Sequence, residues 1–450
     1  MSDELPPGSP GRLGLVLPGG GARAAYQVGV LRAIADLLPA RASNPFPVVT
    51  GTSAGAVNAI AIAVYAERFR VAVGNLERVW RNFQVNQVFK SDSVSLLRSM
   101  LHWGLAMFTG GLLLLPPKSL LDNSPLRELL GAQFDFERIG RAIAAGQIDA
   151  VTIAAAGYTS ARSVSFFQGR PDIEPWKRLR RAGEPTQLSL DHLMASVAVP
   201  FLFPPVLMEG EYFGDGSMRQ ANPFSPAIHL GADRLLVIAT RNDAHAVAQN
   251  APGIPTFGQI FGYMLDALFT DGVYSDVERL TQINRLVDQG VTTTAGGTSL
   301  KKIDLMAVVP SRDLSEIARH HVGVLPRGLR ALLRAMGATH SGGGQLMSYL
   351  LFQDSYTREL MALGYQDAMR CSEQLLEFIR GGTAQSTSAT GMMRRLVEGD
   401  AGGIHVPARQ EPRRGDPGRA PAEDATSGET ELGETALGET AMADTQQVTR

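Results

Sequence analysis

The sequence is poor in residues that form disulfides or metal sites. Its 450 residues include one cysteine, Cys371, so no intramolecular disulfide can form. The eight histidines are scattered, without an HExxH motif or a Cys/His cluster of the kind that binds zinc. We therefore expect neither a metal nor another cofactor. The 42 basic and 44 acidic residues give a net charge of −2, which offers no electrostatic reason to expect nucleic acid as a partner.

The sequence also lacks a segment typical of export or of membrane insertion. Residues 1–8 are acidic and proline-rich, where a secretory signal would be basic and then apolar. The most apolar stretch, residues 101–115, is interrupted by Gly104 and by Gly110 and Gly111, and it is shorter than the roughly 20 residues that span a bilayer. We interpret it as a buried or interfacial segment. The expected location is cytoplasmic, or peripheral to a membrane.

Aromatic residues are absent from residues 381–450, where Gly, Pro, Thr, Arg and Glu dominate. This composition cannot bury enough apolar surface to offset the conformational entropy that folding removes. The sequence therefore predicts a disordered tail over 381–450, in which Gly-Glu-Thr recurs three times as a degenerate repeat. Residues 1–11 are expected to form a flexible N-terminus. Function should lie between these two segments.

The remaining sequence is rich in aliphatic residues and alternates between strand and helix patterns. Residues 13–17 form an apolar run that ends at Gly19, Gly20 and Gly21, and a helix with one apolar face is expected from about Arg23. A second strand and a second helix follow, which indicates a parallel sheet with helices packed on its faces. Further buried strands are expected at 151–156, 164–167, 235–239 and 303–309, a hairpin at 206–213, and a long helix from about 257 to 288.

Ser53 lies in the pentapeptide Gly51-Thr52-Ser53-Ala54-Gly55, between the second expected strand and its helix. This is the strand, tight turn and helix of a nucleophile elbow, in which flanking glycines permit backbone angles and close contacts that a Cβ would block. The alternative is a plain turn from strand to helix.

A nucleophilic serine needs a base that accepts its proton. No histidine downstream of Ser53 has a loop context that marks it as this base; the candidates considered are His192, His229, His245, His320, His321 and His340. Asp215 is a different candidate, because it lies between Gly214 and Gly216 after the expected hairpin. The alternative is a two-residue hairpin turn, for which Asp-Gly is a common signal.

Four segments together resemble patatin-like phospholipases in their order and approximate spacing. They are Pro18 to Leu31, Gly51 to Gly55, Ala195 to Pro205, and Asp215-Gly216-Ser217 with the Asn222-Pro223 that follows. The resemblance is strong over about residues 12–240 and vague from there to 380. Two positions depart from the usual family pattern: Ala24 replaces a glycine, and Ser217 replaces a Gly or Ala.

The resemblance implies a three-layer α/β/α fold around a mostly parallel sheet, with a catalytic domain over 12–240. Residues 241–380 would form a helical or α/β part that packs on this domain or extends it. The resemblance also implies a Ser53–Asp215 dyad without histidine, and an oxyanion hole made by the N–H groups of Gly19, Gly20 and Gly21. Supporting roles would fall to Arg23, Gly51, Gly55 and Gly216, with a solvated side chain as the alternative for Arg23.

The glycine loop has another functional interpretation as a phosphate cradle, since glycine turns before helices bind anions. It lacks the Gly-Lys-Ser/Thr of a P-loop, and Ala24 stands at the last position of a Gly-x-Gly-x-x-Gly pattern. Nucleotide binding is therefore the weaker hypothesis.

The preferred function is a lipid acyl hydrolase of the phospholipase A or lysophospholipase type, working through an acyl-serine intermediate. The alternative is a catalytically weak scaffold that binds lipid or protein. Residues 101–115 and 201–203 are candidate walls of an acyl trough, or plain core, and 80–121 a candidate lid. Contact with a membrane surface is expected through Trp80, Trp103 and Phe108 with Arg81 and Lys90. The basic amphipathic stretch 320–336 is interpreted as a solvated face, and the oligomeric state stays open.

Overall fold

The computed structural model describes residues 11–92, 119–241, 254–293, 299–338 and 344–382, with a few single positions between 98 and 109. The predicted flexible N-terminus, most of the 101–115 stretch and nearly all of the predicted tail lie outside the described residues. The chain divides into a unit spanning residues 1–400 and a second unit, 401–450, that also lies outside them. The description below concerns the first unit.

Within the described residues, ten strands form one sheet in the order β10-β9-β1-β2-β3-β4-β6-β5, with the pair β7 and β8 attached to β3. The strands from β10 to β3 are parallel, whereas β4 and β8 run antiparallel to β3. The expected strands and the hairpin are confirmed. The bounds are β1 Leu13–Leu17, β2 Val48–Thr52, β3 Ala150–Gly157, β4 Ser163–Gly169, β5 Trp176–Lys177, β6 Arg181–Pro185, β7 Val206–Met208, β8 Glu211–Asp215, β9 Arg234–Ile238 and β10 Asp304–Val308.

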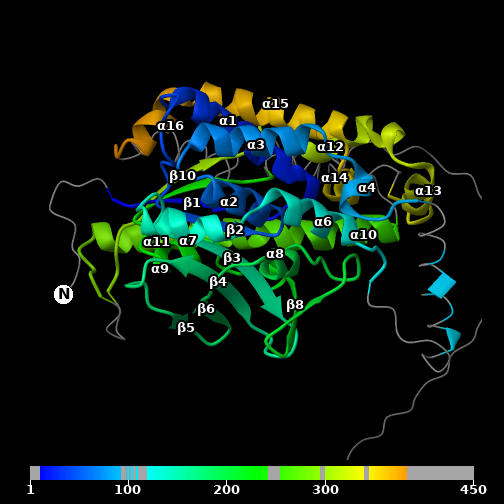
Figure 1. Cartoon of the computed structure of the whole chain (residues 1–450), viewed down its shortest axis with the longest axis horizontal. Helices are drawn as coiled ribbons and strands as arrows, with labels where there is room; N and C mark the ends of the chain where they lie inside the picture. Colours follow the sequence, from blue (N-terminus) through cyan, green and yellow to red (C-terminus); the bar gives the residue numbers. More distant parts are fainter. Residues whose placement is uncertain are drawn as a thin grey trace, which may run out of the picture. The chain divides into compact units, whose positions relative to one another are not determined.

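Helices cover both faces of this sheet (Figure 1). The helix expected over 257–288 is present as α10 and α11, joined without a break by the π-helical turn η4. The longer helices are α1 Ala25–Leu37, α2 Ala54–Val64, α3 Phe69–Arg81, α6 Ser124–Gln133, α7 Glu137–Ala144, α10 Phe257–Asp266, α11 Gly272–Asp288, α13 Arg327–Ala335, α15 Asp354–Arg370 and α16 Ser372–Ile379. Shorter elements are η1 Gly21–Ala24, α4 Val85–Val88, α8 Leu190–Ser196, η2 Gly216–Met218, α9 Ser225–His229, η4 Ala267–Asp271, α12 Leu314–His320, η5 Val322–Val324 and α14 Gly344–Leu350.

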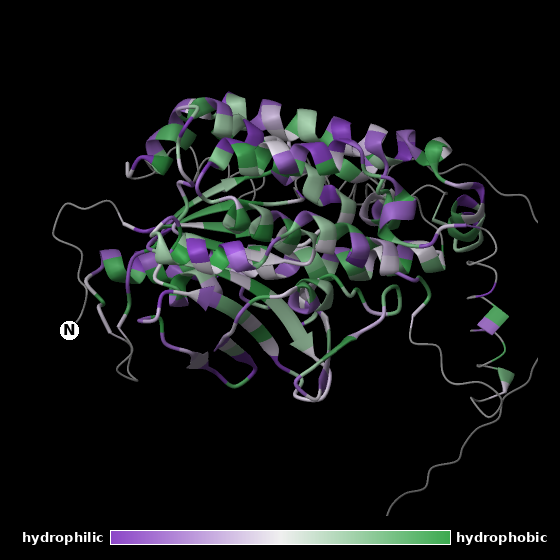
Figure 2. Ribbon diagram, in the orientation of Figure 1, coloured by the Kyte–Doolittle hydropathy of each residue, from purple (hydrophilic) through white to green (hydrophobic). Residues whose placement is uncertain are grey.

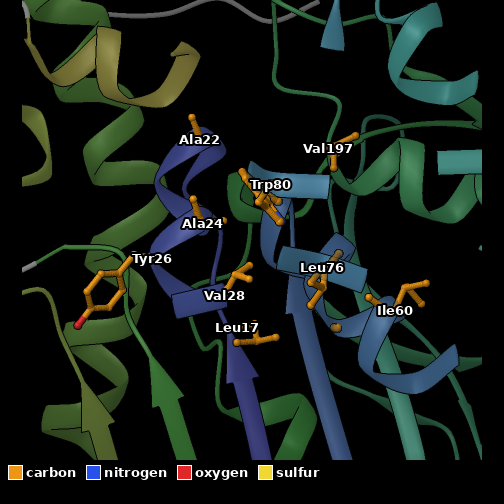
Figure 3. Packing of buried hydrophobic residues seen from close by; sticks show 14 of the residues in the cluster. Leu17, Ala22, Ala24, Tyr26, Val28, Ile60, Leu76, Trp80 and Val197 are labelled. Atoms are coloured by element: carbon orange, nitrogen blue, oxygen red, sulfur yellow. The ribbon is translucent and has the colours of Figure 1, made fainter. Parts of the chain in front are cut away.

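Alternation along each strand divides the core into two layers. Leu15 and Leu17 of β1 belong to a large cluster that includes side chains of α1, α2, α3 and α15, whereas Val16 belongs to a smaller cluster with α9 and α11. The strands are coloured mostly as hydrophobic, and the outer helices alternate between hydrophilic and hydrophobic residues (Figure 2). Val28 of α1 and Ile60 of α2 illustrate the larger cluster (Figure 3). The predicted three-layer α/β/α fold with a mostly parallel sheet is confirmed.

The C-terminal part shares this core. β10 extends the sheet beyond β9, and α15 packs along α1. Two glycines permit that close approach: a Cβ on Gly29 of α1 would lie 2.0 Å from the carbonyl oxygen of Met361, and one on Gly364 of α15 would lie 2.2 Å from that of Tyr26. A boundary near residue 240 stays a prediction.

Candidate active site

The sheet brings Ser53 and Asp215 together through their common neighbour, β3. β2 pairs with β3 as far as Thr52 opposite Ala154, and Ser53 follows Thr52 in the chain. Further along the same edge of β3, β8 pairs with it antiparallel, with Asp215 opposite Ala155. The opposite edge of β3 is occupied by β4. The two candidate residues therefore meet where β8 replaces β2 along one edge of β3.

Ser53 lies in a tight elbow, as its sequence context predicts. Its backbone has φ 52° and ψ −129°, outside the regions that a non-glycine residue ordinarily adopts. The flanking glycines make room for the turn, because a Cβ on Gly55 would lie 2.0 Å from the Leu17 carbonyl oxygen and one on Gly51 would lie 2.5 Å from the Ala56 Cα. Such strain persists only where surrounding contacts hold it, and it is frequent at functional sites.

One segment, residues 196–198, holds the backbone of both candidates. The Ser53 N–H donates to Ser196 Oγ at 2.9 Å, and the Asp215 N–H donates to the Ala198 carbonyl at 2.9 Å. Ser196 is fully buried at the end of α8. The sequence predicts no role for Ser196, although the segment around it contributes to the family resemblance. Nothing in the sequence around Ser196 indicated that its hydroxyl would meet the elbow.

The Asp215 carboxylate is fully buried and only partly hydrogen-bonded. Its Oδ1 accepts the Ser217 N–H at 2.9 Å, while Oδ2 has no hydrogen-bond partner among the described residues. Burial raises the pKa of Asp215 to about 6, although interactions with the Ser53 hydroxyl and with Ser217 act in the opposite direction. The carboxyl group is thus largely ionised at neutral pH and retains one oxygen free to accept a proton. A Cβ on Gly216 would lie 2.2 Å from the Ala154 carbonyl oxygen, so glycine is required for this turn to pack on β3.

The glycine loop ends β1 and leads into η1. No described residue accepts a hydrogen bond from the N–H of Gly19 or Gly20. The Gly19 carbonyl accepts the Thr240 hydroxyl at 3.0 Å, which fixes the loop from the end of β9. Gly21 has φ +54°, and a Cβ there would lie 2.4 Å from the Tyr349 carbonyl oxygen. The loop therefore combines free donors with a backbone that side chains would exclude.

Arg23 anchors this loop from inside the protein. Its guanidinium donates to Asp266 Oδ1 at 2.9 Å, to the Tyr349 hydroxyl at 3.0 Å and to Ser348 Oγ at 2.7 Å, and its side chain is 3% exposed. Burial alone would lower the pKa of Arg23, but Tyr349 and Asp266 raise it more. The alternative of a solvated side chain is therefore wrong, because the guanidinium is enclosed. Arg241 also pairs with Asp266, at 2.5 Å.

An apolar pocket opens beside Ser53. Its walls come from α2, α3, α6 and α14 and from the segment after α8; among the residues that line it are Gly21, Val57, Phe83, Leu130, Val199, Leu202, Phe203, Leu265, Phe269 and Phe352. Leu202 and Phe203 thus match the expected acyl wall, whereas Phe201 is not among the lining residues and is 66% exposed. Most of the other expected wall, 101–115, lies outside the described residues.

Trp80 contributes to this pocket and not to the protein surface. It is buried, and its indole N–H donates to Asn58 Oδ1 at 3.0 Å. The expectation that Trp80 contacts a membrane surface is therefore wrong. The available signal for burial was its place on α3, four residues after the buried Leu76 and seven after the buried Val73. Phe108 is exposed, and Trp103 lies outside the described residues.

Three of the candidate histidines have other partners. His192 contacts Ser189 and the ring of Phe166, His229 contacts Ser225 and stacks on Trp176, and His321 contacts Ser355 and Glu359. His320 ends α12, and His245 and His340 lie outside the described residues. None of the described histidines lines the pocket that contains Ser53.

The sequence of residues 15–228 matches the family described as patatin-like phospholipase. This region is a patatin-like phospholipase domain. The match includes the glycine loop, the elbow, the segment after α8 and Asp215. At the level of the family, the match supports a lipid hydrolase.

Solved structures similar to this protein include VipD from Legionella pneumophila and human GIVD cytosolic phospholipase A2 in complex with methyl γ-linolenyl fluorophosphonate. VipD shares 15% identity, with a TM-score of 0.27, over 87% of this chain and 80% of its own. The human enzyme shares 12% identity, with a TM-score of 0.37, over 86% of this chain. The chain spans 60% of the length of the human enzyme. No curated protein is similar enough in sequence to count as a match.

None of the described helices combines the length and the hydropathy that crossing a bilayer requires. In the same part of the chain, no three His, Cys, Asp or Glu side chains are grouped as a metal site would need.

Proposed function

We propose that the protein is a lipid acyl hydrolase that cleaves carboxylic esters through an acyl-Ser53 intermediate. The observation that carries this proposal is the position of Ser53: a strained elbow beside a buried, partly unsatisfied Asp215, at an apolar pocket. A nucleophile, a base and room for an apolar chain are the three components that such hydrolysis needs.

In the first half-reaction, Ser53 Oγ attacks the ester carbonyl carbon and its proton passes to the free Oδ2 of Asp215. Collapse of the tetrahedral intermediate breaks the bond to the alcohol oxygen, which takes the proton from Asp215 as it leaves. The acyl group then remains on Ser53. In the second half-reaction, Asp215 accepts a proton from water as the water attacks the acyl carbon, and the released Ser53 regains that proton. The products are an alcohol and a fatty acid.

The glycine loop is proposed to stabilise the oxyanion. Gly19 and Gly20 carry N–H groups without acceptors among the described residues, and Gly21 lines the pocket beside Ser53. Preorganised donors act at the moment when negative charge develops, and removing one costs about 2.7–4 kcal/mol of transition-state stabilisation. Arg23 supports the loop by holding η1 against α10 and α14, and it does not touch the substrate.

The lining of the pocket favours an apolar acyl chain. Its lining is composed almost entirely of aliphatic and aromatic side chains, with Tyr349 as a polar exception. Burial of methylene groups there would contribute about 0.8 kcal/mol each. The proposed substrates are therefore phospholipids or lysophospholipids, encountered at a membrane surface.

The competing proposal is a binding module that retains the fold without turnover. A fluorophosphonate probe separates the two, because it modifies only an activated serine. The wild type should be labelled, Ser53→Ala should not, and the control Ser124→Ala, at the start of α6, should be labelled like the wild type. Asp215→Asn should stay folded, as judged by circular dichroism, and lose turnover. Absence of labelling in the folded wild type would favour the binding module, and full activity of Asp215→Asn would exclude the dyad.

A further inference from the structure

Helix α10 exposes an unusually apolar face. Ile254, which precedes the helix, and Phe257, Ile260, Tyr263 and Met264 are all between 47% and 96% exposed. No charged residue occurs from 254 to 265. A soluble surface rarely leaves this many large apolar side chains together on one short helix, so the face requires an explanation.

The other side of α10 belongs to the proposed active site. Leu265 lines the acyl pocket, and Asp266 holds Arg23 below the glycine loop. Gly258 and Gly262 let α10 pack closely on its neighbours, since a Cβ on either would lie 2.8 Å from backbone atoms of residues 336–346. The apolar outer face therefore lies on the same helix as a wall of the pocket.

Helix α13 brings positive charge to the start of α10. The Gly258 N–H donates to the Met336 carbonyl at 2.7 Å, just beyond the end of α13 (Figure 1). Leu329 and Leu333 of α13 are buried, while Arg327 and Arg334 are exposed and Arg330 is partly exposed. No acidic residue occurs between 317 and 338, and none of these three arginines forms an ion pair with a described residue.

We propose that the outer face of α10 and the arginines of α13 together bind the surface of an anionic phospholipid bilayer. The apolar and aromatic side chains would enter the interface, and the arginines would meet lipid phosphates. This inference rests on the proposed function, since it explains how a pocket for acyl chains reaches lipid that is packed in a membrane. A protein partner for this face is an outcome that the test distinguishes.

Co-sedimentation with phospholipid vesicles tests the surface directly. The Ser53→Ala protein is used so that lipid is not consumed, and vesicles contain phosphatidylcholine alone or with about a third phosphatidylglycerol. The parent should bind the anionic vesicles. Phe257→Ser/Ile260→Ser/Tyr263→Ser should weaken this binding at least tenfold. Arg327→Gln/Arg330→Gln/Arg334→Gln should do the same and should also reduce its salt dependence, since each arginine near an anionic surface strengthens adsorption about fivefold.

A matched control comes from the loop before β6, which also presents an exposed leucine between two exposed arginines. Arg178→Gln/Leu179→Ser/Arg180→Gln removes similar groups from a different surface and should bind vesicles like the parent. An equal loss of binding to anionic vesicles in the control and in the α10 variant would overturn the proposal. So would undiminished binding by the α10 variant, or failure of the parent to bind anionic vesicles.

Kinetics with Ser53 intact separate this inference from the proposed function. The α10 variant should lose most of its turnover of vesicle phospholipid and keep its turnover of a dispersed short-chain ester. If neither the wild type nor the α10 variant is labelled by a fluorophosphonate probe, but vesicle binding depends on α10, the proposed hydrolase function is wrong and the proposed membrane-binding surface is supported. If the α10 variant is labelled normally and its turnover of vesicle phospholipid is unaffected, the proposed membrane-binding surface is wrong and the proposed hydrolase function is supported.

Discussion

Thr52 and Asp215 occupy consecutive positions along one edge of β3, opposite Ala154 and Ala155. The spacing between the proposed nucleophile and its base is therefore set by a backbone ladder and not by the side chains themselves. Such a ladder of paired strands is stiff. Hydrogen bonds from the N–H groups of Ser53 and Asp215 to Ser196 and Ala198 hold the ends of β2 and β8 in place. This arrangement explains how a dyad can be held without a third side chain to orient the base.

The pKa of about 6 at Asp215 predicts an acidic limit to activity. Asp215 must be ionised to accept a proton, so kcat/KM for a soluble ester should fall about tenfold per pH unit below pH 6 and reach a plateau above pH 7. Because the folded pKa of Asp215 lies above its unfolded value, the contribution of this group to native-state stability should rise as the pH falls through 6 towards 4. A pH–rate profile from about 4.5 to 8 measures the limit; a midpoint near 4 would contradict it.

Ser217→Ala should move that midpoint upwards. The Ser217 side chain lowers the pKa of Asp215, while its backbone N–H remains in the variant. Without the hydroxyl, less opposes the effect of burial, and the pKa of Asp215 should rise further. The acidic limit of kcat/KM should therefore shift to higher pH, with little change in the plateau value. Ser315→Ala, which alters a buried serine on α12, serves as the control. An unchanged midpoint would show that Ser217 has no influence on the base.

Ser196→Ala should damage activity through the backbone of the elbow. Loss of the hydroxyl leaves the buried Ser53 N–H without its acceptor, which costs about 1–3 kcal/mol. The strained turn should loosen, so we expect a lower kcat with little change in KM, together with reduced thermal stability. Calorimetry and steady-state kinetics measure both effects. Wild-type kcat in a destabilised variant would indicate that Ser196 serves only the fold.

Gly21→Ala should abolish activity, and Gly74→Ala should improve stability. A Cβ on Gly21 would collide with the Tyr349 carbonyl oxygen and would strain a backbone with φ +54°. Gly74 lies within α3, and a Cβ added there would meet no atom within 4 Å, so alanine should stabilise the helix by about 0.5–1 kcal/mol. Urea denaturation compares the two. Similar free energies of unfolding would argue against a constrained glycine loop.

Arg23→Leu should destabilise the protein by about 3 kcal/mol, because it leaves the buried Asp266 with one cationic partner fewer. Arg23→Leu/Asp266→Leu should recover part of that loss, since the orphaned carboxylate is removed as well. A double-mutant cycle of unfolding free energies measures the coupling. Additive losses would mean that the two side chains do not interact in solution.

The parallel sheet, the elbow and the glycine loop were predictable because each depends on local pattern. Gly51 and Gly55 bracket Ser53 in the sequence, and alternation of apolar runs with helical periods identifies the layers. Asp215 needed a resemblance to be chosen, since Asp-Gly by itself indicates only a turn. The Ser53–Asp215 pairing as a catalytic dyad stays a prediction.

The contacts that were missed are all long-range. Ser196 is 143 positions from Ser53, and Arg23 meets Asp266 across 243 positions. Local pattern does not report which distant hydroxyl or carboxylate will face a given group. The sequence is ambiguous at Trp80 for a related reason. An aromatic residue near arginines suits a membrane surface as well as a buried wall, and only the packing of α3 on α2 decides between them.

The bond between Arg23 and Asp266 connects the two ends of the proposed site directly. Asp266 ends α10, the helix with the exposed apolar face, and Arg23 belongs to η1, the turn that begins at Gly21 of the glycine loop. If this bond couples α10 to the loop, a ligand bound at α10 changes the free energy of binding at the loop, and a loop ligand changes the free energy of binding at α10 by the same amount. A covalent inhibitor on Ser53 should therefore change the affinity of the whole protein for lipid vesicles, without touching the surface proposed to bind them.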